Sequence, residues 1–280
     1  MEMKESGSRL SIGPKIATYA ILGGGALLMV APFLWMLSTS LKLPGAVFTY
    51  PPEWIPKPIQ WANYMKAWKA VPFDKFFVNS IIVASCVTVG QVFTCSLAAY
   101  AFARLEFWGR DKIFFAYLGT MMIPFPVTMI PVFILMTKLG WVDSLTALIV
   151  PGLFSAYGTF MLRQFFLTLP KDLEEAAIID GASRWRIYWQ IILPLSKPAL
   201  ATLATFVFMG TCNDFMWPLV IIKSMEKNTV PIGLASFQGL YTTDWTLLMA
   251  AAVIVLVPIL VLYIFNQRFF IKGIAMSGFK

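Results

Sequence analysis

The chain has 280 residues, of which 59% are hydrophobic and only 13% are charged, and its formal net charge is +8. Soluble domains contain roughly 45–50% apolar and about 25% charged residues. This composition excludes an ordinary soluble fold and predicts that lipid surrounds much of the chain. The chain contains no histidine, which excludes histidine-based catalytic triads, metal sites and proton relays. No basic cluster is interleaved with aromatic residues, so nucleic acid is not expected as a partner.

Six apolar stretches are long enough to cross a bilayer as helices, because a hydrocarbon core of about 30 Å needs about 20 helical residues. Long, non-alternating runs predict helices rather than barrel strands. The first stretch is interpreted as a retained helix, because it is longer than the core of a signal peptide. We therefore predict an all-α membrane protein with one transmembrane domain over residues 1–280. Its spans are expected at residues 16–41, 76–103, 113–137, 145–168, 199–222 and 247–267.

The distribution of basic residues predicts the orientation of these spans. Six crossings place both termini on one side, and fourteen of the 22 lysine and arginine residues fall in segments on that side. Cytoplasmic loops carry the excess of basic residues, so both termini are expected in the cytoplasm. Three prolines in the stretch 113–137 (Pro124, Pro126 and Pro131) predict that this span is kinked or broken.

The three cysteines, Cys86, Cys95 and Cys212, lie in separate apolar runs without a C-x-x-C pair. This arrangement predicts neither a disulfide framework nor a zinc site. We expect all three to be small packing residues, and no metal site is predicted.

The segment 169–197, between the fourth and fifth spans, has the pattern of two short helices joined at a glycine. Asp172 is expected to cap the first helix, with acidic residues in its first turn, where the helix dipole favours anions. Gly181 is the expected end of that helix, Ser183 the cap of the second, and Pro194 its end. The segment is thus predicted to lie along the membrane surface and not to cross the bilayer.

The second of these helices places Trp185, Tyr188, Trp189 and Ile192 on one face. Spacing alone leaves two interpretations open. The segment is either an amphipathic connector that rests on lipid headgroups or an element on which a partner protein docks.

The residues of this segment also match a known pattern. Glu175-Ala176-Ala177, Asp180-Gly181-Ala182, Ile191 and Leu193-Pro194 follow the E-A-A-x-x-x-G sequence with an I-x-L-P ending, and Asn213-Asp214-Phe215 and Trp217-Pro218-Leu219 follow it. With these motifs the chain resembles the permease subunits of bacterial ATP-binding-cassette importers. The resemblance is greatest to the carbohydrate-uptake branch that includes the maltose permeases.

The resemblance implies a MetI-like permease fold in a bacterial or archaeal cytoplasmic membrane. It implies a second homologous permease, an extracytoplasmic solute-binding protein, a carbohydrate substrate and a dimer of ATP-binding subunits that docks at residues 169–197. Glu175 would pair with an arginine of the ATPase, and the tail from Arg268 would reach toward it. The implied coupling residues are Glu174, Glu175, Ala176, Ala177, Asp180, Gly181, Ala182, Arg184, Ile191, Leu193 and Pro194.

The energy source is expected to lie in another subunit. The chain has no G-x-x-x-x-G-K-[ST] loop, so ATP and Mg²⁺ are expected on the partner ATPase, with no cofactor bound here. The chain is accordingly expected to be a non-catalytic transport subunit.

Asp214 is the one ionisable residue deep within a predicted span, where a charge costs at least about 2.5–3.5 kcal/mol. It is expected to face water or a partner, and two roles remain open. The first is a polar lining of the substrate path, for which the candidates are Asn213, Asp214, Phe215 and Trp217. The second is a structural hydrogen bond to another helix or to the second permease.

Alternative functions require other features of the chain. The same machinery could carry glycerol-3-phosphate or a polyol. An ion-coupled secondary transporter needs several intramembrane acids and often an internal repeat, whereas only Asp214 is present and no repeat is visible. In a purely structural membrane protein the segment 169–197 would have no partner. The outer segment 223–246 is interpreted either as a contact for the binding protein or as a plain surface loop.

Overall fold

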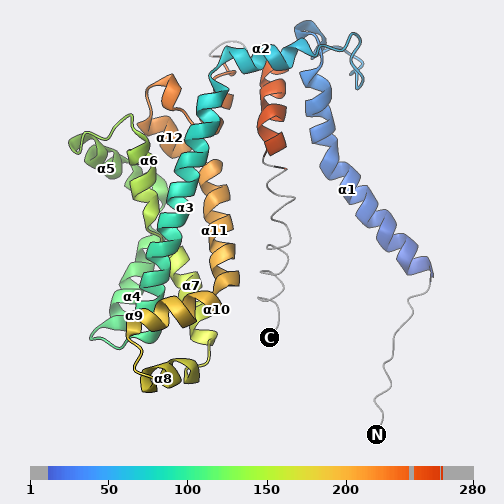
Figure 1. Cartoon of the computed structure of the whole chain (residues 1–280). Helices are drawn as coiled ribbons and strands as arrows, with labels where there is room; N and C mark the ends of the chain where they lie inside the picture. Colours follow the sequence, from blue (N-terminus) through green and yellow to red (C-terminus); the bar gives the residue numbers. More distant parts are fainter. Residues whose placement is uncertain (1–11, 240–242, 259, 261–280) are drawn as a thin grey trace. The chain divides into compact units, whose positions relative to one another are not determined.

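The structure is a computed structural model that describes residues 12–239, 243–258 and 260, and these residues are helical apart from loops and one isolated bridge between Gln238 and Thr243 (Figure 1). The predicted tail contact from Arg268 and the second half of the sixth predicted span lie outside the described residues. The chain divides into two compact units, residues 1–68 with 237–256 and residues 69–236 with 257–280. Each unit is described by itself.

The first unit contains the long apolar helix α1 (Ile12–Ser40), the turn η1 (Pro44–Ala46) and most of α2 (Ala62–Ala70). The Asn63 amide joins the end of α1 to α2, since it donates to the carbonyls of Ser40 (2.9 Å) and Lys42 (2.8 Å). Lys42 is buried with its Nζ 4.0 Å from the centroid of the Trp35 ring, and burial lowers the pKa of this lysine.

A further helix, Trp245–Pro258, contains the first half of the sixth predicted span. The carboxylate of Asp244 caps this helix, because it accepts a hydrogen bond from the backbone N–H of Leu247 at 3.1 Å.

The second unit is built along α3 (Phe73–Arg104), which packs against α7 (Ala156–Thr168) and α11 (Lys197–Cys212). Small residues allow the three helices to approach closely. A Cβ added to Gly158 would lie 2.9 Å from Cys95 Sγ and 3.2 Å from Leu203 Cδ1. Cys95 is fully buried at this crossing, in agreement with its predicted packing role.

The predicted break in the third span is confirmed. Helix α4 (Arg110–Gly119) and the turn η2 (Thr120–Met122) meet α5 (Phe125–Lys138) at an angle of 98°. Pro124 stands at the junction in an extended conformation, with φ −61° and ψ 141°. Pro131 lies inside α5, so the bend occurs at the first two prolines rather than at all three.

The fifth predicted span, 199–222, is not one continuous helix. Helix α11 ends at Cys212, and α12 (Met216–Ile221) begins only after the break at residues 213–215. Three helical segments of the described residues are long and apolar enough to span a membrane, or five if each sharply bent pair counts as one span. The prediction of six spans is therefore not confirmed in the described part of the chain.

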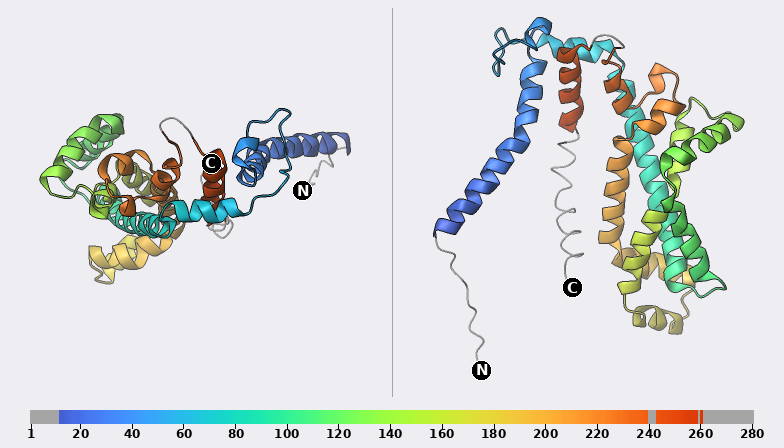
Figure 2. Two further views of the ribbon diagram at one scale, coloured as in Figure 1. Left: turned by 90° about the horizontal axis from the view of Figure 1, so that it is seen from above. Right: turned by 180° about the vertical axis from the view of Figure 1, so that it is seen from behind.

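Helices α5, α6 (Leu145–Ile149) and α12 pack together on the first half of α3 around a second apolar cluster. These three helices lie toward the end of α3 opposite to α8 and α9 (Figure 1 and the right-hand view of Figure 2). The turn η3 (Val150–Leu153) joins α6 to α7. The buried members of the cluster are Val83, Val87, Met136, Ala147, Leu148, Trp217, Ile221 and Ile222.

The first part of the predicted outer segment 223–246 is attached to α3 and is ordered. It contains the turn η5 (Met225–Lys227) and α13 (Val230–Ala235). The Asn79 amide donates to the carbonyls of Glu226 (2.8 Å) and Asn228 (3.0 Å), and Ser80 Oγ accepts from the N–H of Val230 (2.9 Å). These bonds hold the segment on the first turns of α3.

Candidate functional site

The predicted pair of surface helices is present beyond the end of α7. It consists of α8 (Asp172–Ile179) and α9 (Arg184–Ile187), followed by the π-helical turn η4 (Tyr188–Ile192) and the short α10 (Leu193–Leu195). Asp172 is the first residue of α8 and not its cap, since Lys171 takes the cap position without a side-chain bond. The acidic first turn is as predicted, and it remains favourable to the helix dipole.

The second helix does not end at Pro194, in contrast to the prediction from sequence. It continues to Leu195, and the chain then turns by 77° at Ser196 into α11. Pro194 is tolerated because it follows the π-helical turn η4 and lies in the first turn of α10. Backbone N–H groups in the first turn of a helix have no partner within that helix, so the missing N–H of proline costs no hydrogen bond there.

Gly181 ends the first helix in the predicted way. Its φ is +77°, the left-handed region that glycine adopts without a steric penalty. The N–H of Ala182 donates to the carbonyl of Ala177 (2.9 Å), and that of Gly181 donates to the carbonyl of Ile178 (3.0 Å), which is the bonding pattern of a Schellman motif. Ser183 then caps the second helix by accepting from the N–H of Arg186 (3.2 Å).

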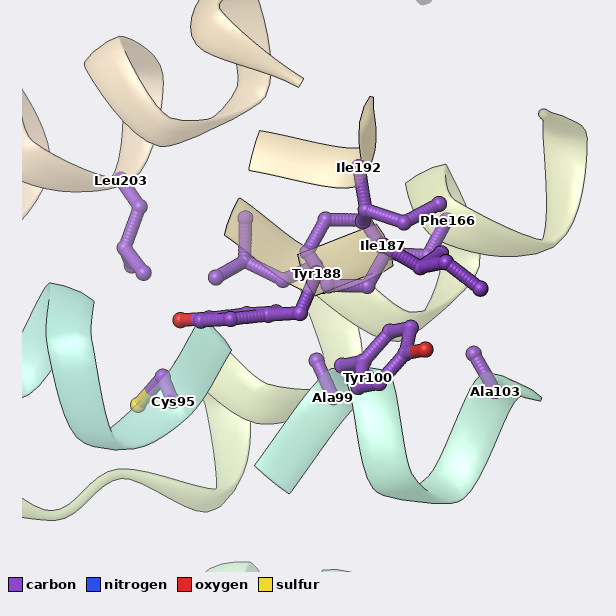
Figure 3. Close-up of a cluster of buried hydrophobic side chains, with 10 residues drawn as sticks. Cys95, Ala99, Tyr100, Ala103, Phe166, Ile187, Tyr188, Ile192 and Leu203 are labelled. Carbon is purple, nitrogen blue, oxygen red and sulfur yellow. The ribbon is translucent and has the colours of Figure 1, made fainter. Parts of the chain in front are cut away.

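Tyr188 anchors the second helix to the rest of the unit (Figure 3). Its side chain is fully buried, and its hydroxyl lies 2.8 Å from Ser96 Oγ of α3. Tyr100 supports the same junction by donating its hydroxyl hydrogen to the carbonyl of Arg184 at 3.2 Å. The buried cluster at this junction contains Cys95, Ala99, Tyr100, Ala103, Leu162, Phe166, Ile187, Tyr188, Ile192 and Leu203.

The side chains of the predicted aromatic face therefore differ in their exposure. Tyr188 and Ile192 are buried within the chain, while Trp185 and Trp189 remain 57% and 45% exposed. The helix is fixed to α3, α7 and α11 by its inner side.

The first helix is fixed by a buried ion pair that the sequence did not predict. Glu174 was predicted to be a coupling residue like Glu175, but its side chain is only 7% exposed, and its Oε1 lies 3.0 Å from Arg104 Nε. Arg104, at the end of α3, also donates to the carbonyls of Phe166 and Leu169 (the latter at 2.7 Å). One guanidinium thus joins the ends of α3 and α7 to the first turn of α8.

The outward surface of the pair is mixed in character. Of the predicted coupling residues, Glu175, Ala176, Asp180, Gly181, Arg184 and Pro194 are exposed, and Ala177, Ala182, Ile191 and Leu193 are partly buried. Exposed apolar side chains lie among them, and Ile179 is 86% exposed. We refer to the exposed residues Leu173, Glu175, Ala176, Ile178, Ile179, Asp180, Arg184 and Trp185 as the outer face. An apolar surface rimmed by charges of both signs has the composition of a protein interface.

Of the four predicted substrate-path residues, three form a break in the chain and the fourth is buried. Asn213, Asp214 and Phe215 form the break between α11 and α12, where the Asn213 amide donates to the carbonyl of Met209 at 2.8 Å. Asp214 Oδ1 lies at 3.5 Å from the N–H of Trp217. Trp217 itself is buried, and its Nε1 donates to the carbonyl of Ala147 at 2.9 Å. Its indole holds α12 on α6 and does not line an open path in this chain.

Sequence reasoning missed Arg104, Ser96 and Tyr100 as partners of the helix pair. Arg104 was counted only among the cytoplasmic basic residues, although a cation at the end of a span next to an acidic surface helix was a usable signal. Within the described residues, no group of three or more side chains is arranged to hold a metal ion.

Comparison with known proteins agrees with this architecture. Residues 91–274 match the family described as binding-protein-dependent transport system inner membrane component. The arabinooligosaccharides transport system permease protein AraQ of Halalkalibacterium halodurans is 40% identical over 205 residues, covering 73% of this chain and 74% of the relative. The sn-glycerol-3-phosphate transport system permease protein UgpE of Yersinia pestis is 35% identical over 274 residues, covering 95% and 97%.

Among solved structures, a chain of a bacterial ABC transporter involved in the import of the acidic polysaccharide alginate has the same fold. The TM-score is 0.82 at 24% sequence identity, over 96% of this chain and 100% of that chain. The alginate transporter in complex with its alginate-bound periplasmic protein gives a TM-score of 0.66 at 14% identity, over 92% and 96%. From the matched family and these relatives, the chain belongs to the inner membrane components of binding-protein-dependent transport systems, as a multi-pass membrane permease.

Proposed function

We propose that this chain is the membrane-spanning permease subunit of an ATP-driven importer that moves a sugar or oligosaccharide across the cytoplasmic membrane by alternating access. The support is the family match together with a relative named for arabinooligosaccharides and the fold shared with an alginate importer. A second homologous permease, two ATP-binding subunits and an extracytoplasmic solute-binding protein complete the assembly. Both termini lie in the cytoplasm.

The rigid attachment of α8 and α9 is the single observation that carries the coupling part of this proposal. The helix pair is held by the Arg104–Glu174 ion pair and by the buried Tyr188, while the outer face is left free. A rigid element can transmit a rigid-body shift from a docked subunit to the spans behind it. The ATPase must bind two states of the permease with different affinity if ATP is to drive the change.

In this proposal the partner ATPase binds ATP and Mg²⁺, and the permease contributes no catalytic residue. Glu175 lies on the outer face with an exposed carboxylate, where it would meet an arginine of the ATPase. Such a charge-assisted pair at a partly desolvated interface contributes more than an ordinary hydrogen bond.

The test is to replace Glu175 with arginine in the complete importer and to measure how much ATPase subunit co-purifies with the permease. Glu53→Arg is the matched control, since Glu53 is an exposed carboxylate in the loop between η1 and α2. We expect loss of the ATPase and of ATP-dependent uptake for Glu175→Arg only. Undiminished ATPase association and uptake in Glu175→Arg would overturn the docking proposal. Uptake driven by an ion gradient without ATP would favour a secondary transporter.

The substrate has a second candidate, because the relative named for sn-glycerol-3-phosphate matches nearly the whole chain. Calorimetric titration of the cognate binding protein with arabinotriose and with sn-glycerol-3-phosphate separates the two. We expect binding of the sugar at micromolar concentration. Binding of the phosphorylated compound alone would remove the sugar assignment and keep the importer.

A further inference from the structure

A groove lies where α3, α7 and α11 cross, apart from the outer face of the coupling helices. Its volume is ≈ 350 Å³, at the small end of the range of about 300–1,000 Å³ that small-molecule sites occupy. Three polar side chains, Gln91, Tyr157 and Thr211, line it together with Leu203, Phe206 and Gly210. Each of the three helices contributes to the wall.

The sequence builds this groove through residues without large side chains. Gly158 and Cys95 bring α3 and α7 into close contact, and the buried Leu203 of α11 packs beside Gly158. Gly210, about two turns beyond Leu203 on α11, has no atom of another residue within 4 Å of where its Cβ would be. The opening is therefore kept free at Gly210, and a larger side chain there would fill it.

The polar lining has unmet hydrogen-bonding capacity. In the described part of the chain, the Gln91 amide, the Tyr157 hydroxyl and the Thr211 hydroxyl have no hydrogen-bond partner. All three lie on apolar helices of the membrane-spanning part, where an unpaired polar group costs free energy. Amides and hydroxyls both donate and accept, which matches the hydroxyl groups of a carbohydrate.

The walls also suit a sugar ring. Tyr157 and Phe206 are 50% and 49% exposed, so their faces remain open beside the polar groups. Aromatic rings contribute large apolar contact areas, against which the C–H face of a pyranose or furanose ring can pack.

The charge of the lining distinguishes between classes of substrate. None of the residues that line the described groove carries a positive charge, and Asp214 lies three residues beyond Thr211 in the chain. A phosphate or carboxylate entering this groove would lose water without gaining a cation, at a large cost in free energy. An uncharged sugar incurs no such cost.

We propose that this groove is a carbohydrate-contacting site of the transport path and that it accepts uncharged sugars rather than phosphorylated or acidic ones. Gln91, Tyr157 and Thr211 bond to sugar hydroxyls, and Gly210 leaves room for the ring. This inference rests on the proposed function, which it narrows to neutral saccharides.

The first test fills the groove without unfolding the helix. Gly210→Leu adds a side chain where no neighbour would be struck, and removing a helical glycine favours the helix. Gly24→Leu in α1 is the matched control, because Gly24 is also helical with open space around it. The assay is uptake of radiolabelled arabinotriose by the complete importer in proteoliposomes with its binding protein.

We expect Gly210→Leu to lower the uptake rate by about tenfold or more, the order of discrimination that one misplaced apolar group produces in a pocket. Assembly with the ATPase and the second permease should be unchanged. Gly24→Leu should transport normally. Normal arabinotriose uptake by Gly210→Leu would overturn the groove proposal while leaving the proposed function intact.

The second test identifies what occupies the groove. In a background with Cys86, Cys95 and Cys212 replaced by alanine, Thr211→Cys is treated with a charged, water-soluble thiol reagent. A sugar path contains water, so we expect reaction at this position, slower in the presence of arabinotriose and its loaded binding protein. Absence of reaction in the intact complex would mean that lipid or the second permease covers the groove, and the proposal would be wrong.

The transport assay distinguishes an error in the proposed function from an error in the groove proposal. If the wild-type importer carries sn-glycerol-3-phosphate but not arabinotriose, the selectivity for uncharged solutes is overturned. If it carries no saccharide by an ATP-dependent route, the proposed function itself is wrong.

Discussion

Arg104 Nε lies 3.0 Å from Glu174 Oε1, and both side chains are less than a tenth exposed. The two residues are far apart in the sequence, one at the end of α3 and the other in the first turn of α8. Their contact fixes the orientation of α8 relative to α3. A charge buried this deeply is stable only with its partner and with further hydrogen bonds, which the carbonyls of Phe166 and Leu169 supply.

Replacing Glu174 with alanine should therefore destabilise the protein strongly. Removal of one partner of a buried pair typically costs about 3–5 kcal/mol, because the other charge remains buried. The measurement is the thermal unfolding of the purified permease complex. Asp172→Ala is the control, since Asp172 is an exposed carboxylate in the same turn of α8 and lies outside the outer face. Equal melting temperatures for the two variants would contradict the structural role of the pair.

A variant that lacks both charges of the Arg104–Glu174 pair tests the effect of the pair on stability separately from its effect on transport. Apolar residues of similar size often replace a buried ion pair without loss of stability, so Arg104→Met with Glu174→Met should fold better than either single variant. If the ion pair transmits motion from α8 to α3, the double variant should retain its ATPase subunits but carry less substrate for each ATP hydrolysed. Unchanged transport per ATP would restrict the pair to a stabilising role.

The conformation of Gly181 gives a prediction that does not depend on packing. Its φ is +77° and no atom lies within 4 Å of where its Cβ would be, so valine would cause backbone strain alone. A β-branched residue in this region is a steric outlier, with a cost of order 1–3 kcal/mol. Gly181→Val should displace α9 and weaken ATPase co-purification, while Gly181→Asn should have a smaller effect.

Gly140 provides the matched control for this experiment. Its φ is +69°, and the space around it is also open. Gly140→Val introduces comparable backbone strain in the turn after α5, away from α8 and α9. Loss of ATPase in both variants would show that general destabilisation is responsible, and loss in neither would show that the bend at Gly181 is not needed for docking.

Two local features of the helix pair, the end at Gly181 and the cap at Ser183, could be predicted from the sequence, because they depend on residues within one turn. Gly181 and Ser183 end and begin helices through bonds to their immediate neighbours. The directions of the side chains could not be predicted in this way. Glu174 and Glu175 are adjacent and chemically identical, and only the position of Arg104 on another helix decides which of them is buried.

The same limit applies to the candidate substrate path. Asn213, Asp214 and Trp217 fall within one apolar run, which predicted a continuous helix and left open whether these residues line a path or make structural bonds. The chain instead breaks at residues 213–215, and Trp217 turns toward Ala147 because a buried indole N–H needs an acceptor. Gln91 and Tyr157 were not chosen as site residues, since a single polar residue in an apolar run carries no signal until the neighbouring helices are placed.

The hydrogen bonds to the Asp143 carboxylate predict how the stability of the second unit depends on pH. The Ser224 hydroxyl and the backbone N–H groups of Ser224 (2.9 Å) and Lys223 (3.0 Å) donate to its carboxylate. These bonds hold the pKa of Asp143 below its ordinary value of 3.8. They join the turn before α6 to the segment after α12.

Since this pKa is lowered by folding, the stabilisation is present above pH 3.8 and is lost as the pH falls through the lower folded value. Asp143→Asn keeps an amide oxygen and tolerates the φ of 60°, but it cannot carry the charge. The variant should melt at a lower temperature than the wild type at neutral pH, with a difference that narrows on acidification. A difference independent of pH would mean that the charge of Asp143 does not contribute.

The crossing of α3, α7 and α11 gives a final prediction, on overpacking. Gly158→Ala would place a methyl group 2.9 Å from Cys95 Sγ, closer than such atoms approach in folded proteins. Forcing the helices apart should cost about 1–3 kcal/mol and deform the groove lined by Tyr157. Cys95→Ala removes the sulfur atom, so the double variant should recover part of the melting temperature and of the arabinotriose uptake. Recovery would show that the helix spacing at this crossing sets the shape of the groove, whereas additive losses from the two substitutions would show that Cys95 and Gly158 act independently.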